Sequence, residues 1–296
     1  MPPRPRPPRH TPRSVVWRRR VVALGVLVAA FAIAWVAVAS VGGKKKAKPP
    51  PPTVLAAPKP FRVVFPEGFT RRQMAARVSA VAQIADRERG KRVHLRERAY
   101  LVATARPRLQ PGFGRRAYPL EGFLFPATYD FTVRTSSPQL VAAQLKAFRA
   151  NWAKLNLGYA RSKNLTPYDV LVIASMIEKE TPAPEERQLV SAVIYNRLHA
   201  HMALGIDAAL RYGLDIPPTE SIHESQLANP TPYNLRLHAG LPPTPIGAPG
   251  LASLQAAAHP AKVNYLYFVA KPDKKHHFFT ASSAAFEQYK AEHGYR

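Results

Sequence analysis

Apolar residues recur at three- and four-residue spacing in several parts of the chain, and this periodicity predicts amphipathic helices. Short apolar runs bounded by turn-forming residues predict strands instead. The expected helices cover 70–84, 138–151, 166–181 and 184–200, and the expected strands are 61–65 and a buried strand at 265–270. Residues 91–105 are predicted to be helical or mixed, and 118–131 a strand or an extended loop.

Three helix starts are marked by residues that favour the first turn of a helix. Thr70 with Gln73 matches a capping box, in which two side chains satisfy free backbone amides. Thr166 precedes Pro167, the arrangement of a cap residue followed by proline at the first helical position. Pro184, Glu185 and Glu186 open the next helix, with acids in the first turn where the helix dipole favours them. Residues 166–200 are therefore predicted to be a helical hairpin with a tight corner. Residues 229–250 form a Pro/Gly-rich loop, after which a further helix is expected through Ala258.

The longest apolar run lies near the N-terminus. Residues 21–43 contain no charged side chain over 23 positions, a length that spans the roughly 30 Å core of a bilayer. A cleaved signal peptide is the alternative, although its apolar region is usually about 7–15 residues long. Seven Arg precede the run and four Lys follow it. The positive-inside rule then predicts a single-pass membrane helix with its N-terminus in the cytoplasm.

The flanking segments differ in composition from the rest of the chain. Residues 1–20 are predicted to be a disordered basic tail, and 44–60 a Lys/Pro-rich spacer. Cysteine is absent, which excludes disulfides, thiolate metal sites and cysteine nucleophiles. The formal net charge of +25 favours anionic partners. Nucleic acid is not expected, because no nucleic-acid-binding motif accompanies the charge and the predicted anchor places the body outside the cytoplasm.

Glu178 is the strongest catalytic candidate among the 18 acidic residues. It ends an apolar helical stretch, and its neighbours one turn back, Ala174 and Ser175, are small enough to leave room for a ligand. An apolar setting favours the protonated carboxylic acid that a general acid needs. The structural alternative is a helix-end glutamate paired with Lys179 or Arg187. Glu180 points to another side of the helix and is expected to face solvent or a basic residue.

Other candidates carry less chemistry. Asp207 is expected in a turn, and Tyr233 and Asn234 lie in the Pro-stiffened loop, where polar groups can be positioned for binding. The ten His are scattered and form no ligand set, so no metal and no cofactor is predicted.

Five stretches together resemble the YceG-like (MltG-type) endolytic murein transglycosylases of bacteria. They are PEGFTRRQMA (66–75), YPLEGFLFPATYDF (118–131), IASMIEKETPAPEERQLVSAVIYNRL (173–198), TPYNLRLHAGLPPTPIGAPG (231–250) and YLYFVA (265–270). They occur in the family's order. The chain departs from the family's usual pattern at Thr244, where a Gly is common, and at Ala248, where an Asn is common.

The resemblance implies an α+β protein with a small LysM-like α/β subdomain at 61–117 and a larger mixed catalytic domain at 118–296. It implies a lyase that cleaves the MurNAc–GlcNAc bond inside peptidoglycan glycan strands and leaves 1,6-anhydro-MurNAc ends. The family's catalytic glutamate falls on Glu178. Asp207, Tyr233 and Asn234 are candidate substrate-binding residues. Peptidoglycan synthases are the implied partners, and the cell-wall side of the cytoplasmic membrane is the implied location.

One acid/base is enough for this reaction. Hydrolases generally use two carboxylates, whereas a lytic enzyme uses the C6 hydroxyl of the sugar as its nucleophile. The alternative function is a membrane-anchored scaffold that binds peptidoglycan without cleaving it.

Overall fold

The computed structural model describes residues 13–40, 60–115 and 117–295, and the chain divides into two compact units, Met1–Pro58 and Lys59–Arg296. In the first unit, the described residues form the helix α1 (Arg13–Ser40). Residues 13–20 are therefore helical, where the sequence predicted a disordered tail. The spacer predicted at 44–60 lies outside the described residues, apart from Pro60.

The bilayer-spanning helix expected at 21–43 is not confirmed. Across the described ranges, no helix combines the length and the hydropathy needed to cross a membrane.

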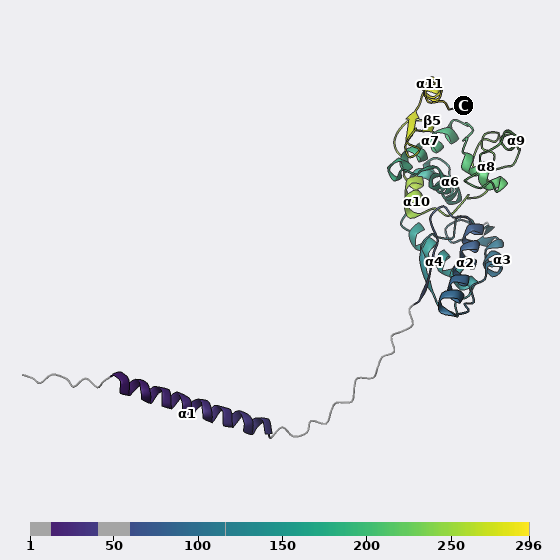
Figure 1. Ribbon diagram of the computed structural model, residues 1–296. Coiled ribbons are helices and arrows are strands. Elements are labelled where there is room, and N and C mark those ends of the chain that lie inside the picture. The colour runs from purple at the N-terminus through teal and green to yellow at the C-terminus, as the bar shows by residue number, and fades with distance from the viewer. Residues whose placement is uncertain (1–12, 41–59, 116, 296) are drawn as a thin grey trace, which may run out of the picture. The chain divides into compact units, whose positions relative to one another are not determined.

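The second unit is mixed α+β, which confirms the predicted fold class (Figure 1). Its helices are α2 (Arg71–Arg89), α3 (Glu97–Ala105), α4 (Ser137–Trp152), α5 (Gly158–Ser162), α6 (Pro167–Glu180), the 3₁₀ turn η1 (Pro184–Glu186), α7 (Arg187–His199), α8 (Asp207–Leu214), α9 (Glu224–Leu227), α10 (Leu251–Ala258) and α11 (Ser283–Glu292). Its strands are β1 (Phe61–Val64), β2 (Arg108–Leu109), β3 (Ala117–Tyr118), β4 (Thr128–Phe131), β5 (Tyr267–Ala270) and β6 (His277–Thr280).

The first part of this unit is a small α/β layer. β1 pairs antiparallel with β4, with Phe61 opposite Phe131, and α2 contacts β1, α4 contacts β4, and α3 packs against α2 and α4 (Figure 1). Thr70 caps α2 with the expected capping box. Because β4 lies beyond residue 117, the pair joins segments on both sides of the predicted subdomain boundary, which stays a prediction.

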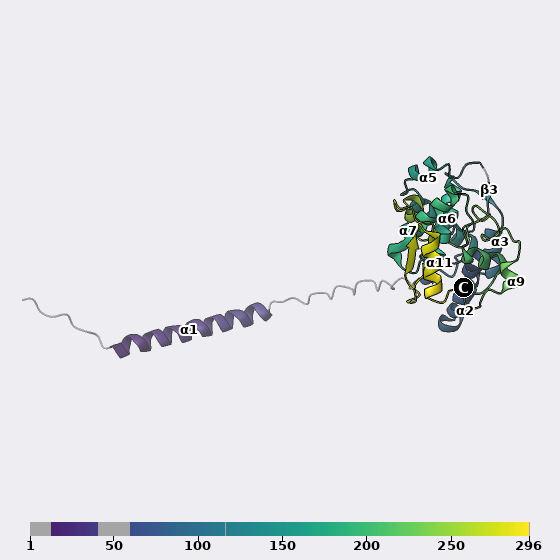
Figure 2. The same ribbon diagram turned by 90° about the horizontal axis from the view of Figure 1, so that it is seen from above.

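The second part is built around α6, which contacts α7, α8 and α10. Residues 170–177 of α6 are all buried, so this helix is the centre of the core. α6 and α7 form the predicted hairpin across η1. α11 packs on the β5–β6 hairpin, and β5 contacts α7; Figure 2 shows this part of the unit from above.

The strand predicted at 265–270 exists as β5, but it is half-buried rather than buried. Among the residues that the structure describes, it pairs with β6 alone, in a two-stranded sheet. A two-stranded sheet lacks the second pairing neighbour that covers an interior strand, which accounts for the difference.

Candidate functional site

Glu178 lies in the last turn of α6, where its position is set by the helix start. Thr166 accepts a hydrogen bond from the Asp169 amide and completes a capping box, and Pro167 occupies the first turn. The buried stripe of the helix then faces the core as far as Ile177. The Glu178 side chain follows directly and is only 7% exposed.

Two groups hold the Glu178 carboxylate. Its Oε2 accepts a hydrogen bond of 2.9 Å from the Gly250 amide. Its Oε1 lies 3.8 Å from Nη2 of Arg187, whose Nε donates to Ser253 Oγ at 3.1 Å. Arg187 is one of the two basic residues that the sequence predicted as a structural partner of Glu178. A carboxyl group fixed in this way can donate a proton when it is protonated, and the cation beside it stabilises the carboxylate that remains.

A turn from the small α/β layer forms one side of the site. The Gly68 amide donates to the Ala248 carbonyl at 2.8 Å, and the Ala248 amide donates to the Phe69 carbonyl at 2.9 Å. Only a glycine fits at Gly247, since a Cβ there would lie 2.6 Å from the Gly68 carbonyl oxygen. These contacts seat the turn against the end of α6.

Glu67, in this turn, is a second carboxylate of the site that sequence analysis missed. A Cβ added at Gly250 would lie 1.7 Å from Glu67 Oε1, so the carboxylate rests against the same glycine whose amide binds Glu178. The residue is exposed as a whole, but partial burial of its carboxyl group raises the pKa of Glu67, the negative charge of Glu178 raises it further, and Arg187 lowers it. Nothing in the sequence marks a glutamate in a Pro-Glu-Gly turn as a site residue.

Glu180 does not face solvent, one of the two surroundings predicted for it. It is half-buried, and its Oε1 accepts a hydrogen bond of 3.4 Å from the Ala208 amide at the start of α8. Burial raises the pKa of Glu180 to about 7; the Ala208 bond lowers it and the charge of Asp207 raises it. The charge of Arg211 in α8 also lowers this pKa, so a basic residue, the other predicted neighbour, does act on Glu180. Solvent does not reach it freely because α8 covers this side of α6, which the periodicity of α6 alone does not reveal.

Asp207 is the first residue of α8 rather than part of a turn. Its Oδ1 accepts hydrogen bonds from Arg236, at 2.9 Å from Nε and 2.7 Å from Nη2, and its side chain is 43% exposed. Asp207 therefore ties α8 to the Pro-rich loop.

The loop residues Tyr233 and Asn234 differ in their surroundings. The Tyr233 hydroxyl lies 2.8 Å from Thr244 Oγ1, and its ring packs against Tyr212. Asn234 is fully buried, and its amide donates to the carbonyls of Leu227 and Asn229. These bonds tie Asn234 to the end of α9 and to the start of its own loop. Within the described residues, Asp207, Tyr233 and Asn234 make no hydrogen bond or ion pair with Glu178.

Glu121 is a buried carboxylate that sequence analysis also missed. It accepts hydrogen bonds from the Arg71 amide at 3.0 and 3.2 Å and from the Tyr212 hydroxyl at 3.1 Å. It therefore joins the first amide of α2 to α8. Burial raises the pKa of Glu121 to about 7, against the hydrogen bonds from Arg71 and Tyr212.

Replacing Glu121 by Gln is expected to flatten the pH dependence of stability. Because its folded pKa of about 7 exceeds the ordinary value of 4.5, the wild-type fold loses stability as pH rises from about 4.5 to 7. The loss is roughly 3 kcal/mol at most. Thermal unfolding at pH 5 and pH 8 measures this loss. The melting temperature of Glu121→Gln should be close to that of wild type at pH 5, and it should rise relative to wild type at pH 8. An equal change at both pH values would contradict the assignment.

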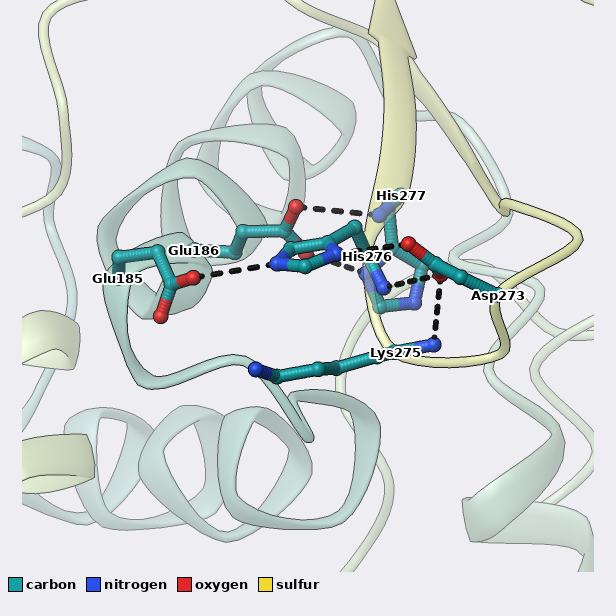
Figure 3. A network of polar contacts seen from close by, with 6 residues as sticks. All are labelled: Glu185, Glu186, Asp273, Lys275, His276 and His277. Carbon is teal, nitrogen blue, oxygen red and sulfur yellow. Dashed lines mark hydrogen bonds and ion pairs between the residues drawn. The ribbon is translucent and has the colours of Figure 1, made fainter.

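A polar network docks the β5–β6 hairpin onto η1 (Figure 3). His277 Nδ1 lies 2.7 Å from Glu186 Oε2, and both side chains are about a tenth exposed. The His277 amide donates to the other oxygen of Glu186 at 3.1 Å. His276 pairs with Asp273 at 2.8 Å and with Glu185 at 3.3 Å. Sequence analysis had assigned Glu185 and Glu186 only to a helix start.

No metal centre is found in the part of the chain that the structure describes: no three His, Asp or Glu side chains gather there as a ligand set. Two hollows lie along α2, one lined by Phe61, Val81 and Ile84 and the other by Ser79, Asp86 and Arg92. Neither includes Glu178. The candidate site around Glu178 is therefore identified by the contacts of its carboxylate with Gly250 and Arg187.

Three comparisons place the chain among known proteins. The model of the YceG-like family matches residues 52–292. A Streptococcus pneumoniae protein named endolytic murein transglycosylase is 34% identical over 183 residues, covering 60% of this chain and 32% of that protein. A Bacillus subtilis protein of the same name is 34% identical over 155 residues, covering 52% of this chain and 42% of that protein.

The fold has a solved counterpart. The 2.6 Å crystal structure of a putative YceG-like protein from Listeria monocytogenes is 28% identical to this chain, with a TM-score of 0.65, and the likeness covers 78% of this chain and 76% of that one. The chain spans less than half the length of the curated relatives that it matches. The family match covers well over half of the residues, and the chain therefore belongs to the YceG-like family.

Proposed function

We propose that this chain is an endolytic peptidoglycan lytic transglycosylase, a lyase that cleaves MurNAc–GlcNAc bonds within glycan strands. The observation that carries the proposal is the fixed, nearly buried carboxylate of Glu178, held between the Gly250 amide and Arg187. The names of the Streptococcus and Bacillus relatives support the reaction. The glutamate is the residue on which the family's motif falls in this sequence.

Glu178 acts first as a general acid and then as a general base. Its proton passes to the glycosidic oxygen as the bond from C1 to that oxygen breaks. The C6 hydroxyl oxygen of the same MurNAc closes on C1, and the hydroxyl proton returns to Glu178. No water is consumed and no second carboxylate is needed for proton transfer. The intramolecular attack has a large entropic advantage over attack by water.

Arg187 has a supporting role in this scheme. At 3.8 Å from Oε1, its guanidinium stabilises the carboxylate after the proton has left. The Gly250 amide fixes the other oxygen, so the carboxylate is oriented before substrate binds. Asp207 and Tyr233 are proposed to line the approach to the site, whereas Asn234 shapes the loop that carries Tyr233.

Product analysis tests the reaction. The full chain is incubated with nascent, uncrosslinked glycan strands, and the new ends are identified by mass spectrometry. Anhydro-MurNAc ends are expected. Reducing ends would show hydrolysis and contradict the lytic mechanism. Glycan binding without any new ends would identify the non-catalytic scaffold instead.

The location is a separate part of the proposal. Residues 21–43 would anchor the chain in the bacterial cytoplasmic membrane, with the enzyme on the cell-wall side, where glycan polymerases release new strands. The uncharged run and its basic flanks support this. The chain should stay with the membrane fraction through alkaline carbonate washing, and recovery in the supernatant would contradict the anchor.

A further inference from the structure

Glu67 occupies a place in the site that its own turn does not explain. Its Oε1 rests against Gly250, where an added Cβ would come within 1.7 Å, and the Gly250 amide binds Glu178. One glycine thus touches the carboxylates of both residues. Across the described ranges, neither oxygen of Glu67 has a hydrogen-bond or ion-pair partner, and the residue is exposed. Glu67 therefore presents free acceptors beside the nearly buried Glu178.

A structural role in starting α2 is already filled by other groups. Thr70 accepts from the Gln73 amide, and Gln73 accepts from the Thr70 amide. Glu121 accepts from the Arg71 amide. Glu67 is consequently not needed as a cap for these amides. What it does meet is the charge of Glu178 and of Arg187, both of which act on its carboxyl group.

The chemistry of a glycan requires such an acceptor. Hydroxyl and acetamido N–H groups of amino sugars are hydrogen-bond donors, and an ionised carboxylate is the strongest acceptor that a protein offers them. The Glu178 carboxyl group has to stay available for proton transfer. A second carboxylate next to it can hold the sugar without taking part in that transfer.

We propose that Glu67 is a substrate-contacting residue of this site, whose carboxylate accepts a hydrogen bond from a hydroxyl or acetamido N–H of the sugar on which Glu178 acts. The inference rests on the proposed function. It makes the turn at 66–69, which belongs to the small α/β layer, part of the active site. Substrate binding would then depend on the seating of this turn through Gly68 and Ala248.

Two substitutions test the contact in different ways. Glu67→Gln removes the charge and keeps the shape. Gly250→Ala keeps the charge but displaces the carboxylate, because the new Cβ needs its space. The φ of −74° at Gly250 suits alanine, and the end of a glutamate side chain moves easily. Glu88→Gln, on the exposed end of α2, is the matched control.

Both variants of the full chain should lower kcat/KM by about tenfold to a hundredfold, the effect of losing one hydrogen bond to a charged group. The melting temperature should stay within a few degrees of wild type, since Glu67 has no internal partner. Glu88→Gln should match wild type in both. A lower melting temperature with unchanged kcat/KM would show a purely structural role and overturn the inference.

Equilibrium binding separates this inference from the reaction. The affinity for uncrosslinked strands of alternating N-acetylglucosamine and N-acetylmuramic acid is measured for two proteins. One is the Glu178→Gln variant, and the other carries both Glu178→Gln and Glu67→Gln. Weaker binding by the double variant is expected. Equal affinity would overturn the role of Glu67 even if wild type produces anhydro ends. If wild type does not cleave the strands, the proposed reaction fails, while weaker binding would still support Glu67.

Discussion

Replacing Glu178 by Gln is expected to abolish glycan cleavage while leaving the fold in place. The Gln side chain can still accept the hydrogen bond from Gly250, and Arg187 keeps its bond to Ser253. It cannot deliver or accept the proton. Since no other group takes over both steps, the rate should fall roughly a thousandfold or more. The appearance of anhydro-MurNAc ends per unit time, measured on the full chain, gives this rate.

Two further variants make this result specific. Glu178→Asp keeps the carboxyl group but withdraws it by one methylene, so it should retain a small part of the activity. Glu220→Gln, at an exposed position outside the site, should be fully active. Glu178→Gln, Glu178→Asp and Glu220→Gln should have similar melting temperatures. A Glu178→Gln variant that cleaves strands at the wild-type rate would remove Glu178 from the mechanism.

Local signals were sufficient to predict the elements that carry the site. The capping boxes at Thr70 and Thr166 fix where α2 and α6 begin, because a cap depends on residues only three positions apart. The apolar stripe of α6 placed Glu178 at the end of a buried helix. Helix starts and helix faces are encoded within a few residues, so they can be predicted from one sequence.

Contacts between distant segments could not be predicted in this way. Glu67 meets Gly250, Glu121 meets Tyr212, and Glu180 meets α8 only after the chain has folded. Each of these carboxylates has an environment set by another element. Their pKa values and their partners therefore follow from tertiary packing, and periodicity gave no indication of them. The same reason explains why the partners of Asn234, the carbonyls of Leu227 and Asn229, could not be predicted, whereas its role in substrate binding stays a prediction.

Replacing His277 by Ala is expected to destabilise the protein by about 3 kcal/mol, because it removes a buried hydrogen bond and leaves one oxygen of Glu186 buried without a partner. Glu186 would keep only the bond from the backbone amide of residue 277, and its second oxygen would lie buried without a partner. The melting temperature should fall by roughly 6–12 °C. Circular dichroism during heating of the full chain measures the change.

The half-buried neighbour His276 is the matched control for this loss. Its pKa is raised by the hydrogen bond to Asp273 and also by Glu185, against the effect of burial. Because its pKa is raised in the folded protein, His276 stabilises the fold below its ordinary pKa of 6.5. This stabilisation is lost as the pH rises through the folded pKa. His276→Ala should therefore cost stability at pH 5.5 and little at pH 8.5.

The loss at His277 should also reach the active site. Glu186 immediately precedes Arg187, so loosening η1 frees the guanidinium that lies 3.8 Å from Glu178. Below its melting temperature, His277→Ala should therefore cleave glycan more slowly than His276→Ala. Glu186→Gln, which keeps the shape and can still accept the amide bond, should fall between them. If His277→Ala has the melting temperature of wild type, the Glu186–His277 contact does not hold the hairpin. The inference that this contact positions Arg187 would then be wrong as well.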